Sequence, residues 1–327
     1  MNKVISIILT IAMIASLLIG CGASEPAAKD ENVLKVAIIQ QLDHSSLDEI
    51  RNAIEAQLNA RAAEKGITLD ISYANGQNDN SMLSQIATEV VADDVDMIIP
   101  IATLAATAAV TAAEGNIPVV YAAISDPESA GLPGMPTVTG VSDALNTPFI
   151  MDMMLSCQPD VKTVGLLYSN SEINSQTPIA EAKAYLESKG IAYLEKTGNT
   201  SGEVIEAAAS LVGRGDAVFT PTDNTVMAAE ASVAERLNAD GSPHYTGADS
   251  FVLSGAFATC GGNYTELGTY TADMAIDILM GGEVGDFHVM DGGIITVNSD
   301  TASAIGIDYS VFSSMANTVN AVATTVD

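Results

Sequence analysis

Apolar and polar positions follow one another along the chain in a pattern that predicts strands alternating with helices. Continuous apolar runs, of the kind found in parallel strands buried on both faces, occur in the first part of the chain. They cover residues 33–39, 67–73, 95–101 and 117–124. Between these runs, apolar side chains recur at helical spacing, which predicts helices over 45–64, 80–92 and 103–113.

The same order of elements returns after residue 160. Strands are predicted over 164–168, 191–196, 217–221 and 243–247, and helices over 178–188, 203–212 and 224–238. Corresponding residues of the two parts are separated by a nearly constant number of positions in the sequence. Asp96 corresponds to Asp216, and Thr103 corresponds to Asp223. The period is much longer than that of a solenoid. We therefore predict the fold class as α/β, with two doubly wound parallel-sheet lobes.

The N-terminus has the pattern of an export signal. Lys3 precedes an apolar run over residues 4–20, which leads into Leu18-Ile19-Gly20-Cys21. A basic start, a short apolar stretch and a small-residue end are typical of a signal peptide. The last four residues resemble a bacterial lipobox, where the peptidase cuts before a cysteine that is lipidated. We predict a lipoprotein signal peptide over 1–20, lipidation at Cys21 and a flexible tether over 21–32. The alternative is an uncleaved anchor with an ordinary cysteine.

Composition narrows the range of functions. With 48% hydrophobic and 16% charged residues, the chain has ample apolar surface for a packed core, which argues against disorder. Its 41 acidic residues against 12 basic ones argue against nucleic-acid binding, which needs clustered Lys and Arg. Three cysteines and three histidines cannot supply a rich metal site, so we expect neither metal nor cofactor. Cys157 and Cys260 could pair outside the cytoplasm, but two free thiols are the preferred interpretation.

Motifs for catalysis are missing from the sequence. It contains no G-x-S-x-G, H-E-x-x-H or C-x-x-C, no Gly-rich loop with a lysine, and no G-x-G-x-x-G after the first predicted strand. We therefore predict that the protein is not an enzyme. The alternative is a secreted α/β enzyme acting on a small polar substrate, since two carboxylates facing a cleft can do acid–base work.

In doubly wound sheets, ligands bind beyond the carboxyl ends of the strands. We expect the loops that follow the predicted strands in both lobes to face one cleft. The candidate ligand-binding residues in these loops are Asp43, Gln77, Ala102, Thr103, Leu104, Ser125, Asp126, Asn170, Asn174, Ser175, Thr222, Asp223 and Asp249.

Several blocks of sequence resemble one known family. They are Val36-Ala37-Ile38-Ile39-Gln40, residues 100–106 (PIATLAA), residues 117–127 (IPVVYAAISDP), residues 138–143 (VTGVSD), residues 164–168 (VGLLY), and the lipobox. The family is the ABC-transporter substrate-binding lipoproteins of the type that carries tryptophan and other aromatic amino acids. The resemblance covers essentially the whole chain after the tether.

The resemblance implies a type I periplasmic-binding-protein fold, in which three crossovers form a hinge between the lobes. Applied here, the crossovers fall near 142–148, 251–258 and 285–289. The N-terminal lobe would comprise 33–142 plus 259–285, and the C-terminal lobe 143–258 plus 286–327.

A free amino acid would need two kinds of partner. Its carboxylate needs backbone N–H groups at a helix start plus hydroxyls, which Thr103 and Ser125 offer. Its ammonium needs a carboxylate, for which Asp223 is preferred, Asp249 is second and Asp126 is the rival in the first lobe. The alternative for each residue is helix capping or turn chemistry.

The resemblance also implies partners and a location. We expect a monomer that captures a small solute, most favourably an aromatic or other apolar amino acid, and delivers it to ABC permease subunits. A lipid anchor would hold the protein extracytoplasmically at the membrane. The remaining alternative is a sensor-type binding lipoprotein for a sugar or a nucleoside, because the fold does not specify the ligand.

Overall fold

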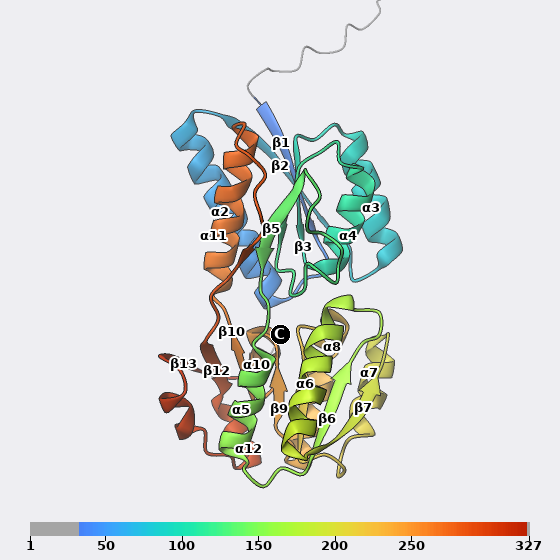
Figure 1. The fold of residues 1–327 in the computed structure, drawn as a ribbon, viewed down its shortest axis with the longest axis vertical. Coiled ribbons are helices and arrows are strands. Elements are labelled where there is room, and N and C mark those ends of the chain that lie inside the picture. Colours follow the sequence, from blue (N-terminus) through green and yellow to red (C-terminus); the bar gives the residue numbers. More distant parts are fainter. Residues whose placement is uncertain (1–32, 326–327) are drawn as a thin grey trace, which may run out of the picture. The chain divides into compact units, whose positions relative to one another are not determined.

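The computed structural model describes residues 33–325, and these form two α/β lobes, each built around its own sheet (Figure 1). The first sheet has the order β11-β5-β4-β3-β1-β2. Its strands are β1 (Val33–Gln40), β2 (Thr68–Asn75), β3 (Met97–Ile101), β4 (Val119–Ala122), β5 (Val138–Ser142) and β11 (His288–Val289). The pairs β1–β3, β3–β4, β4–β5 and β5–β11 are parallel, and the apolar runs predicted this for β1, β3 and β4.

The second sheet has the order β13-β12-β10-β9-β8-β6-β7. Its strands are β6 (Thr163–Tyr168), β7 (Ala192–Thr197), β8 (Ala217–Thr220), β9 (His244–Thr246), β10 (Ala258–Gly261), β12 (Ile294–Asn298) and β13 (Thr318–Val322). Strands β7 to β10 follow the parallel pattern of the first lobe, whereas β12 pairs with β10 in the antiparallel sense. The predicted fold class of two parallel-sheet α/β lobes is confirmed.

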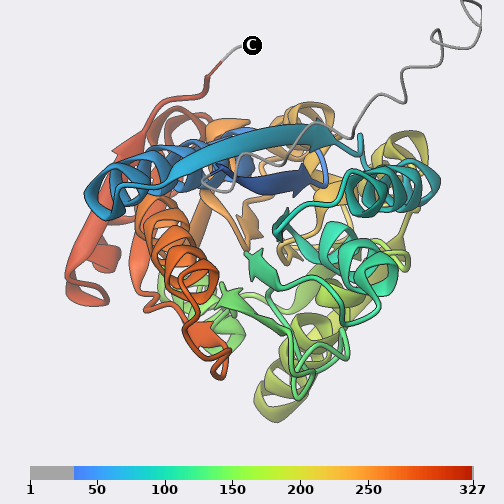
Figure 2. The same cartoon turned by 90° about the horizontal axis from the view of Figure 1, so that it is seen from above.

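Helices cover both faces of each sheet (Figures 1 and 2). In the first lobe they are α2 (Ser45–Lys65), α3 (Asn80–Ala92), α4 (Thr103–Ala113) and α11 (Tyr264–Leu279), with α2 packed on α11 and α3 on α4. In the second they are α5 (Thr147–Cys157), α6 (Gln176–Lys189), α7 (Ser201–Ala209), α8 (Asn224–Met227), α9 (Glu230–Asp240), α10 (Asp249–Leu253) and α12 (Ser299–Ile305). Short 3-10 helices span Ile173–Ser175 and Ser310–Ser314.

Two local predictions need correction. The helix expected over 224–238 is interrupted near Ala228 and divides into α8 and α9. No glycine or proline marks this break, so sequence pattern alone did not indicate it. The strand β5 was not predicted either, although its five residues are buried.

Three segments connect the lobes. The first runs from the end of β5 at Ser142 to the start of α5 at Thr147. The second was expected near 251–258, but β10 pairs with β9 and β12 of the second sheet, so the chain crosses between Gly261 and Tyr264. The third was expected near 285–289, but β11 pairs with β5, so it lies between Val289 and Ile294. The second and third crossovers thus lie further along the chain than predicted, because the short strands β10 and β11 pair with sheets to which the prediction did not assign them.

The predicted signal peptide, Cys21 and the tether lie outside the described residues. Within residues 33–325, no helix combines the length and the apolar character needed to cross a membrane.

Candidate ligand-binding site

The carboxyl ends of the two sheets meet around a cavity of about 30 Å³, which is the candidate ligand-binding site. First-lobe strands β1, β3, β4 and β5 and second-lobe strands β8 and β9 lead into its walls. Its polar lining includes His44, Ser46, Thr103, Ser125, Asp143, Asn174, Thr222 and Asn224, and its apolar lining includes Leu47, Met227, Phe251 and Tyr264. The expectation that loops from both lobes face one cleft therefore agrees with the geometry.

The start of α4 forms one wall of the cavity through Ala102 and Thr103. Ala102 has φ 73° and ψ 164°, a conformation that is strained for any residue with a Cβ atom. It turns the chain sharply out of β3, so that the first N–H groups of α4 point beyond the end of the sheet. One of them, from Leu104, donates to Gln41 Oε1 at 3.0 Å. Backbone strain of this kind is concentrated at functional sites.

Two hydroxyls and a carboxylate form a chain across the cavity. Ser125 Oγ donates to Asp143 Oδ1 at 2.9 Å, and the Oγ1 atom of Thr222 lies 2.7 Å from Ser125 Oγ. Because the Ser125 proton is directed to Asp143, Thr222 must donate to Ser125. Burial raises the pKa of Asp143. Among the described residues, no lysine or arginine lines the cavity.

Asp143 was missed by the sequence analysis. It directly follows β5, so the strand-exit argument would have found it if that strand had been predicted. It sits on the first crossover, where it lines the cavity between the lobes.

The structure argues against Asp223 as the ammonium partner. Its carboxylate is fully buried and does not line the cavity. Oδ2 accepts from Ser169 N at 2.6 Å and from Ser175 Oγ at 2.7 Å, while Oδ1 accepts from Val226 N at 2.9 Å. Asp223 is therefore the N-cap of α8, and Ser175 is one of its partners. The capping alternative therefore describes Asp223.

Asp249 and Asp126 connect the lobes but do not line the cavity. Asp249 Oδ1 accepts from Ser46 Oγ at 2.7 Å, and Asp126 Oδ2 accepts from Thr177 Oγ1 at 2.5 Å. The Ser129 backbone N–H also donates to Asp126, which keeps the pKa of that carboxyl low. Both residues hold the lobes together.

The remaining predicted residues are divided between the cavity and the surface. Asn174 lines the cavity, and its Nδ2 donates to Thr222 O at 2.7 Å. Asp43, Gln77 and Asn170 are exposed and lie outside the cavity lining. Asp43 instead accepts hydrogen bonds from Gln40 Nε2 and Tyr73 Oη.

His44 was not among the predicted ligand-binding residues, but it lines the cavity. Its Nε2 lies 3.4 Å from Asn224 Oδ1 in the opposite lobe. Burial lowers the pKa of His44 to about 4, against the smaller opposing effect of that contact and of nearby Asp48 and Asp43. The imidazole is therefore neutral at neutral pH.

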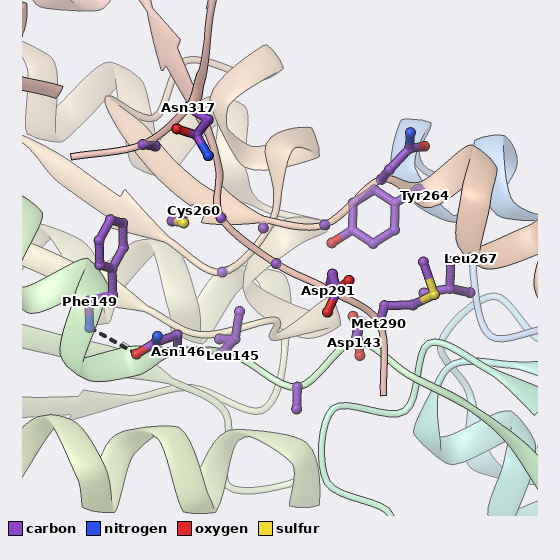
Figure 3. A pocket seen from close by; sticks show the side chains of 18 of the residues that line it. Asp143, Leu145, Asn146, Phe149, Cys260, Tyr264, Leu267, Met290, Asp291 and Asn317 are labelled. Carbon is purple, nitrogen blue, oxygen red and sulfur yellow. Dashed lines mark hydrogen bonds between the residues drawn. The ribbon is translucent and has the colours of Figure 1, made fainter. Parts of the chain in front are cut away.

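A larger pocket of about 480 Å³ lies at the hinge (Figure 3). All three crossovers line it, and it shares Asp143 and Tyr264 with the cavity between the lobes. Figure 3 shows Asp291, Met290 and Tyr264 toward one end and Phe149, Asn146 and Cys260 toward the other. The helix start at α4 and the Ser125–Thr222 pair do not line this pocket, so the groups that meet at the cavity between the lobes are not gathered here. Cys260 and Cys157 are free thiols.

Comparison with known proteins identifies the family. Residues 35–318 match the family model described as ABC transporter substrate binding protein, and the chain belongs to this family. It is 32% identical over 320 residues to a tyrosine-binding protein of Clostridioides difficile, covering 93% of this chain and 92% of the relative. The solute-capturing component of an ABC transporter is thus the class of protein that the fold and the cavity define.

Solved structures of the same type support the fold. A protein of Streptococcus pneumoniae, described as the ABC domain in complex with L-Trp, has a TM-score of 0.82 and 29% identity over 88% of this chain and 99% of that one. A ligand-free, open structure of a Clostridium difficile substrate-binding protein with adhesive properties has 31% identity over 89% and 100%, but a TM-score of 0.67. The described lobes therefore match the complex more closely than the open form.

Proposed function

We propose that this protein captures an aromatic amino acid between its lobes and presents it to an ABC importer. The observation that carries the proposal is the convergence, on one cavity, of a helix start, two hydroxyls and a partly buried carboxylate, with apolar side chains beside them. These are the groups that a zwitterion with an apolar body requires. The relatives whose names mention tyrosine and L-Trp support the same ligand class.

The ligand carboxylate binds at the start of α4. The first N–H groups of a helix lack intrahelical acceptors and carry partial positive charge, which favours an anion. Thr103 adds a hydroxyl at this position, and Ser125 adds another from the end of β4.

The ligand ammonium binds Asp143. Without a ligand ammonium, burial disfavours the charged form of this carboxyl. A cationic group next to Asp143 reverses that effect and forms a charge-assisted hydrogen bond. The distribution of charge thus orients the amino acid with its carboxylate toward the first lobe and its ammonium toward the hinge.

The ligand side chain packs against Leu47, Met227 and Phe251, which come from both lobes. A cavity of about 30 Å³ holds about one water molecule, and small-molecule pockets usually exceed about 300 Å³. The lobes must therefore separate to admit the ligand and then close on it. Ligand binding shifts the population toward the closed form, which the permease recognises.

Anchoring at the membrane follows from the sequence pattern around Cys21. Cleavage before this cysteine and lipidation of its thiol would place the protein extracytoplasmically, anchored through the predicted tether over residues 21–32. We propose that it acts there as a monomer.

The experiment is isothermal titration of the purified protein with L-tyrosine, L-tryptophan and L-phenylalanine, and with glucose and adenosine as comparisons. Tight binding of an aromatic amino acid alone supports the proposal. Binding of the sugar or the nucleoside instead, or turnover of any compound, contradicts it.

A second titration tests the orientation. Asp143→Asn should weaken tyrosine binding by about 10- to 100-fold, the scale of a hydrogen bond to a charged group. It should leave binding of 3-(4-hydroxyphenyl)propionate, which lacks the ammonium, within about twofold. The matched control is Asp291→Asn, which removes an exposed carboxylate from the hinge pocket and should change neither affinity.

A further inference from the structure

Glu172 is a fully buried carboxylate at the contact between the lobes. It lies in the loop between β6 and α6, near the end of β6 that faces the first lobe. Its Oε1 accepts from Gln41 Nε2 of the first lobe at 2.9 Å, and its Oε2 accepts from Asn224 Nδ2 of the second lobe at 3.2 Å. Thr225 Oγ1 lies 3.5 Å from Oε1. The contact joins residues that are 131 positions apart in the chain.

Gln41 connects this carboxylate to the ligand-binding wall. Its Nε2 also donates to Asn78 Oδ1 at 2.8 Å, and its Oε1 accepts from the Leu104 N–H at the start of α4. Asn78 in turn donates to Thr225 Oγ1 at 3.2 Å, which gives a second link between the lobes. Glu172 is thus the centre of a hydrogen-bonded network that exists only when the lobes are together.

The network contains no compensating positive charge among the described residues. Every donor to Glu172 is a neutral amide or hydroxyl. Burial raises the pKa of Glu172 to about 8, and repulsion by the carboxylate of Asp223 acts in the same direction. Asn174 is another neighbour, and its buried Oδ1 accepts no hydrogen bond within the described chain. A proton on Glu172 removes the repulsion and supplies a donor to a cluster rich in acceptors.

We propose that Glu172 is a latch, that is, a positioning residue whose protonated form stabilises the closed arrangement of the lobes. Closure of the lobes on a ligand then takes up a proton. This inference deepens the proposed function and rests on it. Separation of the lobes withdraws Gln41 and admits water to Glu172, which then ionises as an ordinary carboxyl. Closure returns it to a site without water or a cation, where the neutral form is favoured.

The sign of the pH effect follows from this cycle. The closed form has the higher Glu172 pKa, so closure is most favourable at low pH and weakens as pH rises from the open-form value toward about 8. His44 acts in the opposite direction, because closure lowers its pKa to about 4 and expels a proton. Its contribution is confined to pH values below or near its ordinary pKa of about 6.5. Glu172 therefore dominates between about pH 6.5 and 8.

The first test uses the wild-type protein and L-tryptophan or L-tyrosine at pH 7.5. Calorimetry in phosphate and in Tris, which differ in ionisation enthalpy, measures the protons exchanged on binding. We expect an uptake of more than about half a proton per ligand, and an affinity about three- to fivefold weaker at pH 7.5 than at pH 6.5. Equal enthalpies in the two buffers would overturn the proposal.

The second test compares Glu172→Gln with Glu230→Gln. Both replace a fully buried glutamate of the second lobe, but Glu230 contacts His244 within that lobe and does not reach the first one. Glu172→Gln should abolish proton uptake and leave an affinity that stays level or rises slightly with pH, through His44. Glu230→Gln should keep the wild-type profile. A wild-type profile in Glu172→Gln excludes the latch even if its stability changes.

A third measurement separates the latch from the identity of the ligand. If neither amino acid binds at any pH, the proposed function fails, and the radius of gyration from small-angle scattering still tests the latch without ligand. Wild-type protein should be more compact at pH 6.0 than at pH 8.0, and Glu172→Gln should show no such change. An equal radius for wild-type protein at the two pH values would refute the latch.

Discussion

Ser46 and Asp249 are joined by a hydrogen bond of 2.7 Å, although they belong to different lobes and lie 203 positions apart. Ser46 Oγ also accepts from the Ser250 N–H at 3.2 Å, so one hydroxyl connects the start of α2 to the start of α10. This contact stabilises only the closed arrangement, because the two helices belong to separate sheets. Its loss is therefore expected to appear in ligand affinity.

Ser46→Ala should weaken amino-acid binding by about fivefold, corresponding to about 1 kcal/mol for one intramolecular hydrogen bond. The free energy of unfolding should change less than the binding free energy. The control is Ser45→Ala, which removes an exposed hydroxyl one residue earlier. Equal affinities for the two variants in calorimetry would show that the Ser46–Asp249 contact does not contribute to closure.

Asp223→Asn should reduce stability rather than affinity. An asparagine amide in this position would direct N–H groups at Ser169 N and Ser175 Oγ, which now donate to Oδ2. Leaving buried donors unpaired costs about 1–3 kcal/mol, and urea denaturation measures this loss directly. If the variant instead kept its stability and bound tyrosine at least tenfold more weakly, the ammonium role expected from the sequence would be restored.

Gly268→Ala should destabilise the first lobe. Gly268 lies on α11, where an added Cβ atom would come 2.5 Å from Ile50 O and 2.7 Å from Ala53 Cβ on α2. Such overpacking costs about 1–3 kcal/mol. Gly202→Ala provides the contrast, because this glycine lies on α7 with no atom within 4 Å of the added Cβ. It should stabilise the protein by up to about 1 kcal/mol, through helix propensity. Thermal unfolding of the two variants should move in opposite directions.

Cys21→Ser should abolish lipidation in the native host. Mass spectrometry of the wild-type protein should show an N-terminus at Cys21 that carries acyl chains, and labelling with a fatty-acid analogue should disappear in the variant. Cys157→Ser serves as the control because this thiol lies within the folded part and is free. An intact residue 1 in mature wild-type protein would support the uncleaved anchor instead.

The local pattern of apolar and polar residues was sufficient to predict most of the strands and helices of the fold. Apolar runs such as 95–101 predicted parallel strands buried on both faces, because in a doubly wound sheet every side chain of a central strand meets a helix. The helix over 80–92 was predicted to the residue, because apolar side chains recur along it at helical spacing. The short strand β10 was missed, since four residues carry too little pattern to show with which sheet they pair.

The sequence by itself determined the twin α/β lobes and the sheet edges that form the candidate site, because these follow from periodicity and from the order of elements. The family resemblance rested on short blocks of sequence. Only the tertiary structure decided which carboxylates are available to a ligand. Asp223 and Asp143 both follow strands, yet three donors from separate segments surround Asp223, whereas Asp143 lines the cavity. Glu172 became distinctive only when closure placed Gln41 beside it. Burial and hydrogen-bond partners arise from residues distant in the chain, so no local pattern contains them.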